Sequence, residues 1–104
     1  MGAVAFDKGG CQAMLRKHPA LRGRVEQALE GQAANGMFKS KLATTARWKG
    51  LPIWECRINE RSVGSVRAAF VLEGDDATVL FLSATLPKRA FGAELEQFLG
   101  RRRP

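Results

Sequence analysis

Four basic side chains stand in or directly after strand-like segments, and their type suits them to bind phosphate. Arg57 and Arg67 each interrupt an otherwise apolar segment, and Lys88-Arg89 follows a third. A charged side chain is costly to bury without a partner, so such residues usually face a charged ligand or a solvated sheet surface. We therefore expect these positions to converge on one face that binds a phosphate backbone. For Arg57 the alternative is an ion pair with Glu55 or Glu73.

The overall charge of the chain also favours an anionic partner. The 104 residues include 17 Lys and Arg against 10 Asp and Glu, which gives a net charge of +7. Most of the basic residues lie from Lys39 onward, and such clustering is typical of nucleic-acid-binding proteins. The candidate RNA contacts are Lys39, Lys41, Arg47 and Arg89. The alternative is a basic surface that only keeps the protein in solution.

The remaining composition indicates a globular protein of the cytoplasm. Hydrophobic residues make up 45% of the chain, as in ordinary folded domains. The longest apolar runs, 68–72 and 79–82, are too short to cross a bilayer, so we expect no membrane partner. Segment 1–6 lacks the basic start and apolar core of a secretory signal. Cys11 and Cys56 have no C-x-x-C spacing, and we expect free thiols, with Cys56 in the core.

The elements that must position the basic side chains begin with a short strand and two helices. Segment 3–6 is strand-like, Gly9-Gly10 is a break, and 12–17 has helical spacing. Pro19 opens a second helix, and Asn35-Gly36 ends it. The two helices are expected to form a hairpin.

The second half of the chain has the alternation of strands. Segment 37–51 is basic and loop-like, and the segments after it place apolar residues at every second position. We therefore expect an α+β fold of one domain over 1–104, in which an N-terminal strand and helical hairpin pack on a small, mainly antiparallel sheet with a short C-terminal helix. The expected elements of this half are strands over 53–58, 66–72 and 78–85, a turn over 73–76 and a helix over 91–99.

This order of elements on a small basic chain resembles the RelE/ParE/HigB superfamily of bacterial toxins from toxin–antitoxin systems. The resemblance covers nearly the whole chain. Lys49-Gly50-Leu51-Pro52 before Trp54-Glu55-Cys56-Arg57 is similar to the family's "K-G-L … L-x-E-L-R". Arg67 resembles the arginine of the following "Y-R" strand, and segment 79–89 resembles a hydrophobic strand followed by two lysines.

The resemblance implies a ribosome-dependent endoribonuclease that cuts translated mRNA and inhibits translation. In such a reaction a 2′-hydroxyl attacks its own phosphate and gives a 2′,3′-cyclic phosphate. By position, Arg57 and Arg67 would stabilise the phosphate, and Lys49 would act as a base or clamp. Lys88 and Arg89 would hold the backbone or assist the leaving group. The single His and the lack of clustered acids agree with a reaction that needs no metal and no cofactor.

The resemblance also implies a partner, and the sequence leaves a second activity open. A cognate antitoxin protein would bind the toxin, as a possible hetero-oligomer, and mRNA on the ribosome would be the substrate. The chain has no tyrosine, which some ribonuclease members use near the C-terminus. The alternatives are therefore a ParE-like inhibitor of DNA gyrase or a non-catalytic RNA-binding module. We expect Glu55 to be a poor general base, because an ion-paired carboxylate has a low pKa.

Overall fold

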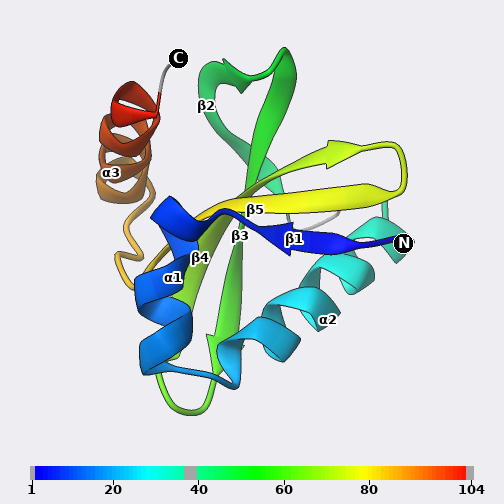
Figure 1. Ribbon diagram of the computed structural model, residues 1–104, viewed down its shortest axis with the longest axis vertical. Coiled ribbons are helices and arrows are strands. Elements are labelled where there is room, and N and C mark those ends of the chain that lie inside the picture. The colour runs from blue at the N-terminus through cyan, green and yellow to red at the C-terminus, as the bar shows by residue number, and fades with distance from the viewer. Residues whose placement is uncertain (1, 37–39, 103–104) are drawn as a thin grey trace.

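Over residues 2–36 and 40–102, which the computed structural model describes, five strands form one sheet and three helices pack on it (Figure 1). In space the strands follow the order β1-β5-β4-β3-β2, with β1 parallel to β5 and the other neighbours antiparallel. The expected α+β fold, mainly antiparallel, is therefore confirmed. The elements are β1 (Val4–Phe6), α1 (Lys8–Lys17), α2 (Leu21–Ala34), β2 (Lys41–Trp48), β3 (Leu51–Glu60), β4 (Gly64–Glu73), β5 (Asp76–Ser83) and α3 (Lys88–Arg101).

Helix α1 begins earlier than the sequence pattern indicated. Asp7 is its N-cap and accepts a hydrogen bond from the amide of Gly10 at 3.1 Å, which satisfies a free donor of the first turn. Gly9 and Gly10 therefore lie inside the helix, and the predicted break was wrong. Helix α1 approaches the sheet closely at Gly10, since a Cβ atom there would lie 1.8 Å from the carbonyl oxygen of Leu80 in β5.

The predicted helical hairpin is confirmed, with one correction at its turn. Pro19 lies in the turn between the helices, and α2 begins at Leu21. The helix ends at its C-cap Asn35, as the sequence predicted. Its fully buried residues face the sheet and join a core with residues of β3, β4 and β5. These helix residues are Leu21, Val25 and Leu29.

Residues 41–48 form strand β2, so the prediction of a loop over 37–51 was wrong for this part. Among the described residues, strand β2 lies at the edge of the sheet and pairs with β3 alone. Edge strands often carry charged residues, which discourage pairing with other chains. Such residues also interrupt the alternation of apolar positions from which a strand is predicted. The register also shifts between Leu42 and Arg47, which breaks the simple alternation. The antiparallel part of the sheet therefore has four strands where three were expected.

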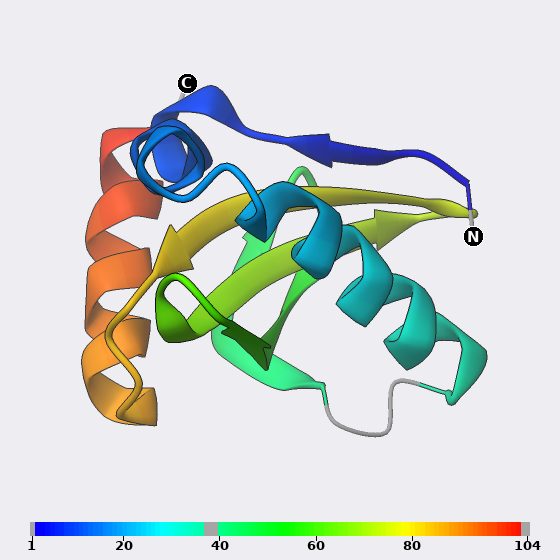
Figure 2. The ribbon, with the colours of Figure 1, turned by 90° about the horizontal axis from the view of Figure 1, so that it is seen from below.

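The predicted alternation of β3 and β4 is confirmed and gives the sheet two apolar faces. One face packs on α1 and α2, and it includes Cys56 and Phe70. The other packs on α3, and it includes Ile53 and Val71. Figure 2 shows α2 and α3 on opposite sides of the strands. Both cysteines are free and buried, as expected for Cys56.

Helix α3 is longer than the predicted 91–99 and begins at Lys88. The expected pair Lys88-Arg89 therefore stands in the first turn of a helix. The buried side of α3 fills the second core. Within the described ranges, no helix is long and apolar enough to cross a membrane. The buried residues of α3 are Phe91, Leu95, Phe98 and Leu99.

Replacing Gly10 with alanine should destabilise the protein, although alanine is the better helix former. The new Cβ atom would overlap the Leu80 carbonyl, so α1 or β5 must shift. We expect the free energy of unfolding, measured by urea titration, to fall by about 2 kcal/mol. Gly23→Ala is the matched control, because nothing lies within 4 Å of its Cβ position and it should gain about 0.5–1 kcal/mol. Equal stabilisation by both substitutions would contradict the close approach of α1.

Candidate functional site

Arg57 and Arg67 lie directly opposite each other on neighbouring strands. They are paired positions in the register of β3 and β4, and such positions project their side chains to the same face. It is the face on which α3 packs, because Ile53 and Ala69 have the same parity and contact α3. Arg57 is exposed, and its Nη2 donates to Ser65 Oγ at 3.2 Å. The expected convergence of basic side chains is therefore confirmed for these two.

A buried carboxylate lies beside Arg67. Glu55 is 2% exposed, and the Nη1 group of Arg67 donates to its Oε1 at 2.9 Å. Its Oε2 is buried and has no hydrogen-bond partner among the described residues. Burial raises the pKa of Glu55, and the charges of Arg67, Lys88 and Lys41 oppose that rise. The expected ion pair of Glu55 is confirmed, but its partner is Arg67 and the expected low pKa was wrong.

Arg67 also holds the segment that leads from β5 into α3. Its Nε donates to the backbone oxygen of Leu86, so one guanidinium joins β3, β4 and this segment. Two hydroxyl groups of the segment are bound in turn by a carboxylate of α3. The segment before α3 is thereby joined to the sheet through Arg67 and to the helix through Glu94. These further bonds run from Ser83 Oγ to Glu94 Oε1 at 2.7 Å and from Thr85 Oγ1 to Glu94 Oε2.

Two lysines add positive charge around Glu55. Lys41 of β2 is the paired neighbour of Glu55 across the β2–β3 ladder, and Lys88 is the first residue of α3. Both side chains are exposed, and both lie close enough to act on the pKa of Glu55. We call Lys41, Arg57, Arg67 and Lys88 the cationic face. It draws on three consecutive strands and on helix α3.

A groove lies beside the cationic face, between β2 and α3. Its volume is about 580 Å³, and Lys88 belongs to both the groove and the cationic face. Arg89 also lines the groove and is exposed, so the positive surface extends along it. The other lining residues are Ala43, Gly92, Ala93 and Glu96.

The remaining candidate residues lie elsewhere. Lys49 stands in the turn between β2 and β3, where Arg47 donates to the carbonyl of Gly50 at 3.1 Å. In Figure 1 this turn is at the top, and the β3–β4 turn is at the bottom. Leu51 and Arg57 are six positions apart on one extended strand, a distance of about 20 Å. The structure therefore does not bring Lys49 next to Arg57, and Lys39 lies outside the described residues.

The cationic face can bind a phosphodiester and stabilise negative charge that develops on it. A guanidinium binds phosphate oxygens through parallel N–H donors, and Arg57 uses only Nη2 within the described residues. Arg67 is mostly engaged by Glu55 and Leu86, so Arg57 is the freer of the two. Glu55 is too buried to reach a ligand, and it acts through Arg67.

Sequence reasoning discounted Glu55 and did not single out Glu94. A usable signal for Glu55 was its position in an apolar strand, at the same parity as buried Ile53. Glu94 gave no such signal, because its partners Ser83 and Thr85 come from another element.

In comparisons with known proteins, no family model, no curated protein and no solved structure matches this chain.

Replacing Glu55 with glutamine should change how stability depends on pH. The folded protein binds the Glu55 proton more tightly than the unfolded chain does, because burial raises the pKa above its ordinary value of 4.5. The contribution of this group to stability therefore falls as the pH rises past that value. We expect the free energy of unfolding of the wild type minus that of Glu55→Gln to fall from about pH 4 to about pH 7 in urea titrations.

Glu60→Gln is the matched control for this pH experiment. Hydrogen bonds from Ser62 lower the pKa of Glu60, so the corresponding difference should rise with pH. If the difference in free energy of unfolding between the wild type and Glu55→Gln also rises with pH, the fold favours the ionised form of Glu55, contrary to our prediction.

Proposed function

We propose that this protein is the toxin of a toxin–antitoxin pair, a metal-independent and ribosome-dependent mRNA endoribonuclease. The 2′-oxygen of one nucleotide would attack the adjacent phosphorus while the bond to the 5′-oxygen breaks, which gives a 2′,3′-cyclic phosphate. The 2′-hydroxyl loses a proton and the leaving 5′-oxygen gains one. The protein must hold the strand in line and neutralise the charge on phosphorus.

The observation that carries the proposal is the exposed guanidinium of Arg57 within the cationic face. It lies opposite Arg67, on a face where the carboxylate of Glu55 is buried among the cations. A phosphate at Arg57 would meet several positive groups, since Lys41 and Lys88 are close to the same carboxylate. Charge of this kind is most effective on the transition state, where the phosphate carries more negative charge than in the substrate.

The groove between β2 and α3 supports a strand of RNA as the ligand. Lys88 lies where the groove meets the cationic face, and Arg89 lines the groove beyond it. Successive phosphates of one strand could therefore follow these residues, with Lys88 placed to hold the backbone or to protonate the leaving oxygen. The net charge of +7 would add long-range attraction to RNA.

The test is 5′-end mapping of an mRNA in a reconstituted translation reaction. Wild-type protein should cut the message only when ribosomes are present. Arg57→Ala should lower the cleavage rate by about 100-fold, because it removes one charge-stabilising group. Thermal unfolding should remain near that of the wild type, since Arg57 is exposed and forms no ion pair within the described residues.

Lys49→Ala is the matched control, because it removes a cation from the distant β2–β3 turn. We expect it to retain cleavage within a few-fold of the wild type. Arg67→Ala is a weaker probe, since it would also release Glu55 and the segment at Leu86. An intact message with the wild-type protein would overturn the proposal and favour gyrase inhibition or a non-catalytic interaction.

A further inference from the structure

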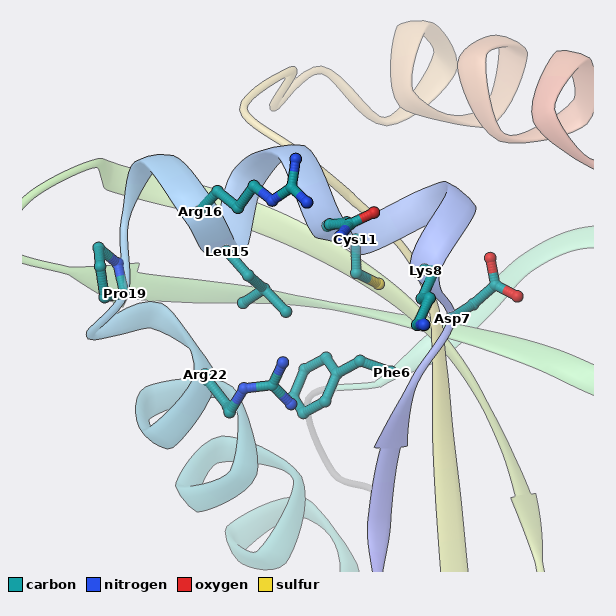
Figure 3. A pocket seen from close by; sticks show the side chains of 9 residues that line it. Phe6, Asp7, Lys8, Cys11, Leu15, Arg16, Pro19 and Arg22 are labelled. Carbon is teal, nitrogen blue, oxygen red and sulfur yellow. The ribbon is translucent and has the colours of Figure 1, made fainter.

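A second basic site lies on the other side of the sheet, in a pocket formed by β1, α1 and α2 (Figure 3). The cavity has a volume of about 330 Å³, which is within the range of small-molecule sites. Phe6 enters from β1, Leu15 from α1 and Arg22 from α2, so three elements meet around one space. We call this cavity the α1–α2 pocket.

Three cations line the α1–α2 pocket without acidic partners. Lys8, Arg16 and Arg22 are exposed, and none of them forms an ion pair within the described residues. Like charges repel when they are brought together, so a pocket of this composition favours an anion that offsets the repulsion. Arginine forks and a lysine ammonium together suit the oxygens of a phosphate group.

Asp7, the acid among the described lining residues, already accepts hydrogen bonds from other groups. Asp7 accepts from the amide of Gly10 through Oδ2, and its Oδ1 accepts from Arg102 at 2.6 Å. The Cys11 thiol adds no negative charge either, because burial raises its pKa to about 12. The three cations are therefore not neutralised from within the pocket.

Arg22 is held in an orientation that leaves its donors available. Its guanidinium carbon lies 4.6 Å from the centre of the Phe6 ring, and Figure 3 shows the side chain reaching from α2 across to that ring. A guanidinium stacked on an aromatic face keeps its N–H groups in its own plane, directed away from the ring. The contact thus orders the arginine without using its hydrogen bonds.

The pocket also has an apolar wall. Phe6 and Leu15 are half-buried, and Pro19 closes the end at the turn between the helices. A free inorganic anion would leave this surface in contact with water, whereas a compact apolar group would cover it. The cations and the apolar wall together suit a ligand that has one anionic group and one apolar group.

We propose that the α1–α2 pocket binds a small phosphomonoester with an apolar or aromatic body. Arg22 binds the phosphate, Lys8 and Arg16 add positive charge around the pocket, and Phe6, Leu15 and Pro19 contact the body. The pocket is separate from the cationic face, since it is built from β1, α1 and α2 on the opposite side of the sheet.

The test is a titration of the ¹⁵N-labelled full chain with phenyl phosphate, followed by amide chemical shifts. We expect saturable shifts in α1 and the start of α2. The dissociation constant for phenyl phosphate should be at least about 10-fold below that for inorganic phosphate, because the phenyl group covers the apolar wall. Benzoate, with one charge fewer, should bind more weakly than phenyl phosphate.

Two variants separate this site from the cationic face. Arg22→Gln should weaken phenyl phosphate binding by about 10-fold or more, because it removes one charge-assisted hydrogen-bond donor. Arg57→Ala should leave the shifts in α1 unchanged, and Lys17→Gln is the control for a charge on α1 that does not line the pocket. The proposal is overturned if phenyl phosphate binds no tighter than inorganic phosphate, if Arg22→Gln has no effect, or if the shifts appear only around Arg57.

Discussion

The ion pair between Glu55 and Arg67 is the interaction on which the cationic face depends. Arg57 and Arg67 are paired positions on adjacent strands, an arrangement that is unfavourable for two like charges. Glu55 is placed on the same face and neutralises part of that charge from a buried position. Burial of this carboxylate is costly, and the charges of Arg67, Lys88 and Lys41 offset part of that cost. The basic surface and the stability of the sheet are therefore linked through one side chain.

The same arginine connects the sheet to α3, so the geometry of the face does not rest on strand pairing alone. Arg67 binds Glu55 on β3 and Leu86 before α3, while Glu94 binds the hydroxyls of that segment from the helix. These bonds position the backbone at Lys88, whose side chain is exposed. In preorganised sites, the residues that contact the ligand are typically positioned by other residues in this way.

The sequence predicted those features that depend on neighbouring residues along one strand. The alternation in β3 and β4 is confirmed, Cys56 is buried as expected, and Arg57 and Arg67 lie on one face as expected. Strand β2 was missed because an edge strand with charged residues and a register shift shows no clean period. The parity that Glu55 shares with Ile53 indicated its burial, but the raised pKa was missed because the sequence does not show that desolvation outweighs the nearby cations.

The parallel pairing of β1 with β5 has a consequence for the order in which this protein can fold. The strand at the start of the described chain finds its only neighbour in β5, which the ribosome makes after β2, β3 and β4. Helices α1 and α2 likewise bury their apolar sides against strands made later. The apolar surfaces of β1, α1 and α2 therefore remain exposed until the later strands are synthesised. In a chain that stalls before β5, chaperones and proteases can bind these surfaces.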